Sequence, residues 1–381
     1  MIKGDLHLKK VLITATVQSH IVQFHVPLID MLHKHGYEVH AAARNNLAEK
    51  NGLKLESPDR VYDIPFDRSP FGRNNIIAYI RLKKIMGDNM YSIIHCNTPM
   101  AGVLTRLAAR KARKAGTKVF YTAHGFHFYK GAPFKNWLLY YPVEKWLAWH
   151  TDRIITITKE DFEMASARLR SQVFRIHGVG VSPERFFPVP AEEMIEIKKK
   201  LGYSEDSFLL LCTGELNRNK NQSAVIKAVA EVVKTDSNIK LLLAGNGPME
   251  KELKKLAKTL NLDKNVIFLG YRTDLEKFVN ISDIVISASF REGLGLNIIE
   301  AMLCAKPVIA SINRGHKELV RDGITGYLIF PRDIRGFAGS ILNLKQDRNL
   351  AKEMGKAGKN TAQPFLSGNV TGELRKIYDM E

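Results

Sequence analysis

Two glutamates stand eight residues apart in the stretch Arg-Glu-Gly-Leu-Gly-Leu-Asn-Ile-Ile-Glu, which ends at Glu300. The first, Glu292, falls in a predicted strand-to-helix loop, where Gly293 and Gly295 let a ligand approach the backbone closely. Glu300 falls inside the apolar helix that follows, and a carboxylate buried there needs a polar partner such as sugar hydroxyls. The helix N-terminus beside Glu292 favours an anion such as phosphate. The stretch therefore predicts a phosphate and polyol site, against the alternative of two acids on a solvated helix face.

Two further loops place polar groups after predicted strands. The loop 213–221 contains Arg218 and Lys220, and two cations at a strand end suit a diphosphate, although a solvated basic loop explains them equally well. The other loop follows a strand predicted at 265–269 and has a backbone edge that could pair with a nucleotide base. Its residues are Tyr271, Arg272 and Thr273. Because ligands of open α/β sheets bind outside the carboxyl ends of the strands, both loops are candidates for binding.

Histidines follow two predicted strands in the first half of the chain. His124 stands beside a glycine just after the strand 118–122, where it could face a cleft between domains and contact a sugar hydroxyl or a phosphate. His20 and His25 lie near the first strand-to-helix turn, which has no glycine and is therefore not a dinucleotide fingerprint. A histidine in such a place is more often a satisfied structural residue, so both interpretations stay open.

The elements that must position these residues alternate along the whole chain. Strands are predicted at 10–16, 39–43, 92–96, 118–122, 153–158 and 173–177, and then at 207–212, 240–244, 265–269, 283–288, 307–310 and 327–330. Short strands rich in Val, Ile and Leu, separated by helices such as 21–35, indicate parallel sheets covered on both faces. The predicted fold class is therefore α/β, with two Rossmann-like domains facing each other across a cleft.

The segment 182–190 holds three prolines and predicts the boundary between these domains. We expect one Rossmann-like domain at 1–185 and a second at 186–381. The last helix, at about 367–381, could return to pack on the first domain.

Composition narrows the possible functions. The chain has 381 residues and a net charge of +18, and residues 68–145 alone carry +12. Such a field attracts phosphates, nucleic acid or an anionic membrane, but no helix-turn-helix, zinc or RNA-binding signature supports nucleic acid. Three widely spaced cysteines fit no disulfide framework or zinc pattern. Neither a signal peptide nor a transmembrane run is predicted, so we expect a cytoplasmic protein.

Aromatic and basic residues coincide in the charged segment. All three tryptophans, Trp137, Trp146 and Trp149, lie within thirteen residues and have lysines such as Lys145 beside them. Aromatic residues next to lysines suit a membrane interface, where each nearby cation adds roughly 1 kcal/mol at an anionic leaflet. The alternative is that the aromatics belong to the core. We predict membrane-facing side chains at Trp137, Lys145 and Trp146, and a peripheral position on the inner face of the cell membrane.

These residues together resemble a known family. The glutamate pair around Gly-Leu-Gly, the segment Tyr-Thr-Ala-His-Gly-Phe at 121–126, and Gly-Glu-Leu-Asn before Lys-Asn-Gln at 214–222 are similar to retaining GT-B glycosyltransferases of family 4. More narrowly, the chain resembles bacterial capsule and exopolysaccharide enzymes over nearly its whole length. The resemblance implies that residues 186–381 hold a nucleotide-diphosphate sugar, most simply a UDP-sugar, and that residues 1–185 bind the acceptor.

The resemblance also implies roles for single residues. Glu292 and His124 would contact the donor sugar, Lys220 would neutralise the leaving diphosphate, and Glu300 would bind the ribose hydroxyls. Further donor contacts would come from Gly214, Arg218, Gly293, Leu294, Gly295, Leu296, Tyr271, Arg272 and Thr273. Contacts to the acceptor would come from His20, His25 and Phe126. Many relatives carry arginine where Glu215 stands, so Arg218 is the candidate replacement for that charge.

The activity implied is that of a retaining, metal-independent hexosyltransferase. It would extend a polyprenyl-diphosphate-linked saccharide in exopolysaccharide or capsule synthesis. No Asp-x-Asp pair occurs, so we expect neither a metal-bridged diphosphate nor a cofactor. The alternatives are a GT-B-shaped sugar-nucleotide epimerase, which needs no acceptor, and a basic nucleic-acid-binding protein.

Overall fold

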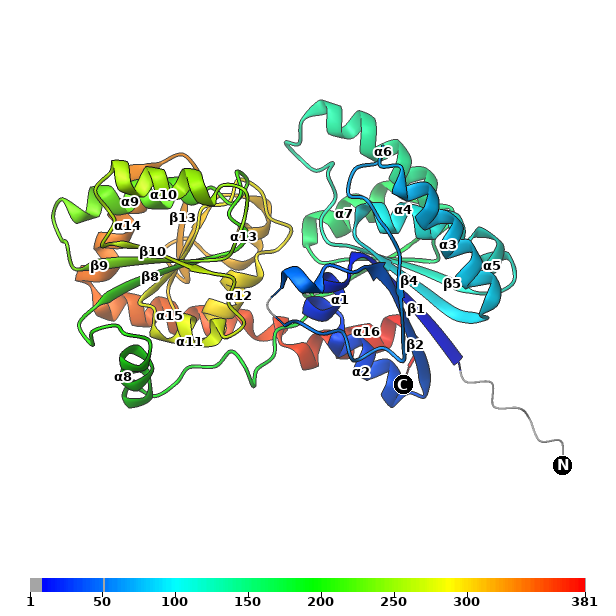
Figure 1. The fold of residues 1–381 in the computed structure, drawn as a ribbon, viewed down its shortest axis with the longest axis horizontal. Helices are drawn as coiled ribbons and strands as arrows, with labels where there is room; N and C mark the ends of the chain where they lie inside the picture. The colour runs from blue at the N-terminus through cyan, green and yellow to red at the C-terminus, as the bar shows by residue number, and fades with distance from the viewer. Residues whose placement is uncertain (1–8, 51, 381) are drawn as a thin grey trace. The chain divides into compact units, whose positions relative to one another are not determined.

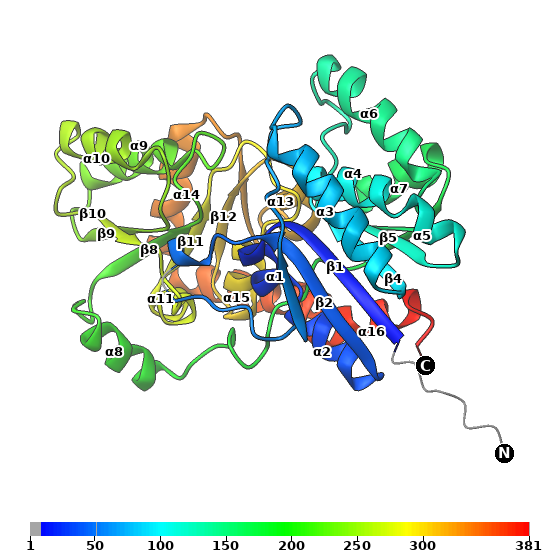
Figure 2. The same cartoon turned by 45° about the vertical axis from the view of Figure 1, so that its right-hand side comes forward.

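The computed structural model describes residues 9–50 and 52–380. The opening segment, for which no signal peptide is predicted, lies outside the described residues, as does position 381 at the end of the predicted last helix. The described chain forms two compact α/β units, which Figures 1 and 2 show. The first unit takes the chain up to Gly180 together with Ser367–Glu381, and the second is Val181–Leu366.

The boundary lies five residues earlier than the sequence predicted. Val181 already belongs to the second unit, because its N–H donates to the carbonyl of Phe365 at 2.9 Å and it bridges to Leu366. The prolines at 183, 188 and 190 therefore stand just after the division and before the first helix of the second unit.

The first unit is built on a seven-stranded parallel sheet of order β3-β2-β1-β4-β5-β6-β7. Its strands are β1 (Lys9–Val17), β2 (Tyr37–Arg44), β3 (Arg60–Asp63), β4 (Tyr91–Asn97), β5 (Lys118–Ala123), β6 (Arg153–Thr156) and β7 (Gln172–Arg175). The inner strands are continuous apolar runs, as expected where helices cover both faces of a sheet. The edge strand β3 is largely exposed and has no apolar run, which is why it was not predicted.

Helices cover both faces of this sheet. They are α1 (Gln18–Phe24), α2 (Val26–Lys34), α3 (Asn74–Asp88), α4 (Pro99–Ala108), α5 (Arg110–Lys114), α6 (Phe134–Ala148), α7 (Lys159–Arg168) and α16 (Ser367–Ile377), with a 3₁₀ turn at Leu47–Glu49. α3 and α6 pack on α4, whereas α2 packs on α1 and α16 (Figures 1 and 2).

The single helix predicted at 21–35 is wrong. The helix stops at His25 and restarts at Val26, because Pro27 has no N–H to continue the ladder. The break leaves His25 between α1 and α2, at the carboxyl end of β1.

The last helix belongs to the first unit. The hydroxyl of Tyr378 and Nδ1 of His95 on β4 lie 2.6 Å apart, and Glu373 pairs with His177 at 2.6 Å. These contacts fasten α16 to the sheet from the far end of the chain.

The second unit has a six-stranded parallel sheet of order β10-β9-β8-β11-β12-β13. Its strands are β8 (Phe208–Thr213), β9 (Ile239–Ala244), β10 (Val266–Gly270), β11 (Ile284–Ser287), β12 (Val308–Ser311) and β13 (Gly326–Ile329). Its helices are α8 (Ala191–Lys200), α9 (Gln222–Val233), α10 (Glu250–Thr259), α11 (Leu275–Ile281), α12 (Leu296–Leu303), α13 (Arg314–Leu319), α14 (Ile334–Gln346) and α15 (Arg348–Ala362), with a 3₁₀ turn at Gln363–Phe365.

Two helical layers enclose the core of the second unit. α9 packs against α10 and α14 in one layer, and α12 packs against α11 and α15 in the other (Figure 1). Every residue of β8, β11 and β12 is buried. Burying each such aliphatic side chain contributes about 1.5–3 kcal/mol, so this core fixes the strand ends that carry the loops. Over residues 9–50 and 52–380, no helix has both the length and the apolar character needed to cross a membrane.

Candidate active site

The strongest candidate site lies at the carboxyl edge of the second sheet. The chain begins this sheet with β8, adds β9 and β10 on one side, and then adds β11 to β13 on the other. The loops after β8 and β11 therefore run in opposite directions from neighbouring strands. Ligands of doubly wound sheets bind at such a switch point, because the diverging loops leave a crevice.

These two loops carry Lys220 and Glu292, which the structure brings into direct contact. The ammonium Nζ of Lys220 lies 2.7 Å from Oε1 of Glu292. Two hydrogen bonds hold the loops together: Phe290 N–H donates to the carbonyl of Asn219 at 2.8 Å, and the side-chain amide of Asn219 donates to the carbonyl of Arg291 at 2.9 Å. The sequence singled out both residues but not their pairing.

The pair is largely enclosed, with side-chain exposures of 23% for Lys220 and 12% for Glu292. Burial acts to raise the pKa of the Glu292 carboxyl, but the charge and hydrogen bond of Lys220 outweigh it, with help from the Ser289 hydroxyl. The pKa of Glu292 therefore lies below its usual range, and the residue is a carboxylate at neutral pH. An ammonium and a carboxylate side by side can hold a phosphate and a hydroxyl at adjacent positions.

The N-terminus of α12 opens beside this pair. The residue before the helix, Gly295, has φ +96°, a left-handed conformation that favours glycine. No side chain caps this end, so its first amide groups are available to an anion. A Cβ at Gly295 would also approach the ring of His316 to 3.1 Å, so the close approach and the backbone conformation both favour glycine here.

Glu300 lies one turn into α12 and is partly buried. Burial raises the pKa of its carboxyl to about 7, Glu276 raises it further, and Arg185 acts against the rise. Arg185 itself is bound to Glu276, with Nε and Oε2 3.0 Å apart. Among the described residues no hydrogen bond to the Glu300 carboxyl is recorded, so this group can accept hydrogen bonds from a ligand.

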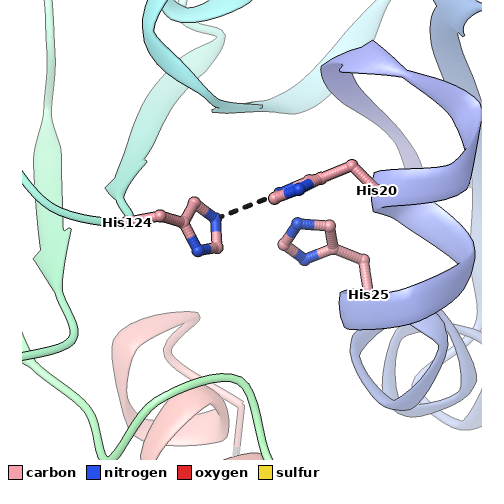
Figure 3. A group of neighbouring side chains, drawn as sticks. All are labelled: His20, His25 and His124. Carbon is pink, nitrogen blue, oxygen red and sulfur yellow. Dashed lines mark hydrogen bonds between the residues drawn. The ribbon is translucent and has the colours of Figure 1, made fainter. Parts of the chain in front are cut away.

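In the first unit the structure joins three histidines that the sequence offered separately. Nε2 of His20, on α1, lies 3.4 Å from Nε2 of His124, which follows β5. His25 points into the same space, and one nitrogen from each ring lies within 4.8 Å of the others (Figure 3). The Asn97 amide oxygen, at the end of β4, lies 3.3 Å from Nε2 of His124. The cluster thus occupies the switch point of the first sheet, between β1 and β4.

Comparison with known proteins identifies the family. The model of glycosyl transferases group 1 matches residues 193–361, and that of glycosyl transferase 4-like proteins matches residues 10–158. The chain is 44% identical over 372 residues to the "Putative glycosyltransferase EpsD" of Bacillus subtilis, covering 97% of this chain and 96% of that protein. The chain belongs to glycosyltransferase family 4.

Two further comparisons give a relative of known activity and a solved structure of the same fold. It is 29% identical to the UDP-Gal:alpha-D-GlcNAc-diphosphoundecaprenol alpha-1,3-galactosyltransferase of Escherichia coli, over 80% of this chain and 78% of that one. HepE of Anabaena, solved in complex with UDP and glucose, shares the fold with a TM-score of 0.79 at 22% identity, over 97% of this chain and 99% of that chain. The predicted α/β class with two Rossmann-like domains of the GT-B type is thus confirmed.

The remaining predicted donor contacts lie around the same edge of the sheet. Gly214 lies in the same loop as Lys220, just after β8, and Arg218 of that loop is exposed. Leu294, in contrast, is buried, so only its backbone is available to a ligand. The segment Tyr271–Thr273 follows β10, with β9 between it and β8. The guanidinium of Arg272 is already held by both carboxylate oxygens of Asp274, at 2.8 and 2.7 Å.

Two predictions for the first unit conflict with the structure. Phe126, expected at the acceptor, is 4% exposed and packs against Phe128 inside the core in a tilted arrangement, with ring centroids 5.0 Å apart. Trp137, expected at the membrane, is half-buried and packs on the same core, and its indole N–H donates to the carbonyl of Tyr129 at 3.3 Å. In both cases the aromatic belongs to the core, which was the alternative left open.

His316 is a site residue that sequence reasoning missed. It lies on α13 after β12, and its Nδ1 is 2.8 Å from the carbonyl oxygen of Ser311 and 2.9 Å from the side-chain amide nitrogen of Asn313. Its Nε2 is buried without a partner among the described residues, next to Gly295. Its position could have been found, because the loop after β12 ends at the same carboxyl edge as the other site loops.

Proposed function

We propose that this glycosyltransferase moves a sugar, with retention at the anomeric carbon, from a UDP-sugar to a polyprenyl-diphosphate-linked saccharide in exopolysaccharide or capsule synthesis. The observation that carries the proposal is the Lys220–Glu292 pair beside the uncapped end of α12. That arrangement presents a cation and amide dipoles to a diphosphate and a carboxylate to a sugar. The E. coli relative, named for a UDP-sugar donor and a diphosphoundecaprenol acceptor, supports the substrate classes.

The chemistry requires that negative charge be stabilised as the diphosphate leaves. Lys220 and the α12 amides supply fixed positive potential where that charge develops, which is the largest electrostatic contribution in reactions of this kind. Glu292 accepts a hydrogen bond from a donor-sugar hydroxyl, and Glu300 accepts from the ribose hydroxyls. The acceptor oxygen then bonds to the anomeric carbon on the face that the diphosphate leaves, which retains the configuration, and the alcohol proton passes to the departing diphosphate oxygen.

Radiolabel transfer from sugar nucleotides into lipid extract tests this activity. We expect Lys220→Ala and Glu292→Gln to lose most of the transfer. The matched controls are Lys254→Ala and Glu250→Gln, which alter an exposed ion pair of the same type on α10 (2.6 Å) and should keep the wild-type rate. Equal activity in all five proteins would reject the site. NMR of the donor incubated without acceptor would instead reveal a second sugar isomer if the protein were an epimerase.

We also propose that α6 is the membrane-contacting element. Exposed apolar side chains run along it, with Phe134 81%, Leu138 64% and Trp146 49% exposed, and Lys135 and Lys145 stand among them. Exposed aromatic and aliphatic groups next to lysines match the interface of an anionic leaflet. Because Trp137 packs on the core, we assign the predicted membrane contact to Phe134 and Leu138 instead.

Co-sedimentation with phosphatidylglycerol vesicles tests this surface. The triple variant Phe134→Ser, Leu138→Ser, Trp146→Ser should remain in the supernatant, whereas Phe330→Ser, which removes an aromatic that is 68% exposed in the second unit, should sediment like wild type. Equal sedimentation of both variants would show that α6 does not contact lipid.

A further inference from the structure

The three-histidine cluster has the composition of a transition-metal site. Each ring offers one nitrogen, and these three atoms lie within 4.8 Å of one another. They come from two segments about a hundred residues apart, which meet only because β1 and β5 end at the same edge of the sheet. In Figure 3 the rings of His20 and His25, from the helical side, converge on that of His124.

The spacing of the rings suits a tetrahedral ion. With Zn–N distances of about 2.0–2.1 Å, two ligand nitrogens of a tetrahedral site lie about 3.3–3.4 Å apart. Nε2 of His20 and Nε2 of His124 are 3.4 Å apart. The third nitrogen, from His25, lies within 4.8 Å of the other two, so this ring must approach them when the ion binds.

One of the three rings lacks a partner. Nε2 of His25 is buried without a hydrogen-bond partner among the described residues, which is costly unless something binds it. A metal ion at the cluster would supply that partner.

We propose that His20, His25 and His124 bind a divalent transition-metal ion, Zn²⁺ foremost, with the fourth position open to water or to a ligand. Three imidazoles without a carboxylate favour zinc, nickel or copper over magnesium and calcium, which prefer oxygen ligands. The Asn97 amide oxygen lies 3.3 Å from the same Nε2 of His124, so that nitrogen must exchange this contact for the ion. The inference does not depend on the proposed sugar transfer, and it departs from the metal-free site that the sequence predicts.

Metal binding by the full chain, purified without a polyhistidine tag, tests the proposal. After equilibrium dialysis against ZnSO₄ and then metal-free buffer, we expect one zinc per chain by plasma mass spectrometry. Co²⁺ in its place should give the visible d–d bands of a tetrahedral or five-coordinate nitrogen site. His25→Gln and, separately, His20→Gln should lose both signals, and thermal unfolding curves should show that each variant is folded.

The matched control is His33→Gln, which removes a solvent-accessible histidine of the same unit that pairs with Asp59 at 2.9 Å. It should keep one zinc per chain and the cobalt bands. Wild-type protein with less than about a tenth of an equivalent of zinc would overturn the proposal. So would zinc retained by both His25→Gln and His20→Gln, because the ion would then be bound elsewhere. Neither result bears on whether the chain transfers sugar.

Discussion

Replacing Lys220 by methionine removes one ammonium and keeps most of the side-chain volume. If the ammonium stabilises the leaving diphosphate, kcat should fall by ~10²-fold or more, which corresponds to about 2.7 kcal/mol of transition-state stabilisation. The same change leaves Glu292 enclosed without its partner at 2.7 Å. Breaking a fully buried pair costs about 3–5 kcal/mol of stability, and the 23% exposure of Lys220 places the expected cost below that range.

A double variant separates these two effects. In Lys220→Met/Glu292→Gln no charge is left unpaired, so the free energy of unfolding, measured with urea, should recover toward the wild-type value. Transfer should remain at least as slow as in Lys220→Met, because the cation is still missing. Initial rates with saturating donor and acceptor report kcat, and urea curves on the same preparations report stability. A Lys220→Met protein with wild-type kcat would refute the reasoning, even if it were less stable.

Three further outcomes are expected. Burial raises the pKa of the Glu300 carboxyl to about 7, so UDP affinity measured by calorimetry should rise between pH 6 and pH 8 as this group ionises. Glu300→Gln should flatten that dependence, and a pH-independent wild-type affinity would contradict the prediction. Arg106→Met should lower the free energy of unfolding by about 3–5 kcal/mol, because the fully buried guanidinium binds Glu144 at 2.8 and 3.0 Å between α4 and α6. An unchanged urea midpoint would show instead that water reaches the pair. Added Zn²⁺ should slow sugar transfer and EDTA should restore it, because the ion occupies the His124 nitrogen that the family resemblance assigns to the donor sugar. In His25→Gln, Zn²⁺ should lower the rate by a smaller fraction of that variant's own metal-free rate.

The strand and helix alternation was readable because the inner strands are continuous apolar runs. All of β8, from Phe208 to Thr213, is buried, and its run of apolar residues predicts that burial. β3 was not readable, since an edge strand with solvent on its residues needs no apolar pattern. Pro27 indicates the break at His25, because proline interrupts a helix. The periodicity of the surrounding residues nevertheless predicted one continuous helix.

The members of the donor site could be predicted, but their contacts could not. Local sequence identifies Lys220 and Glu292 as polar groups after strands, while their pairing depends on β8 and β11 being neighbours in the sheet. The three histidines were likewise identified as polar groups near strand ends. Their proximity could not be predicted, because it depends on the order of the strands in the sheet. Aromatic residues were the weakest part of the prediction, because burial of Phe126 and Trp137 depends on packing that spacing does not encode.

The account rests on the diphosphate of the donor being held at the switch point of the second sheet. A crystal structure of the full chain with UDP tests this most directly. We predict the diphosphate within hydrogen-bonding distance of Lys220 Nζ and of the first amides of α12, with the ribose hydroxyls on the Glu300 carboxylate. A diphosphate bound away from α12, with Lys220 still paired only to Glu292, would contradict it.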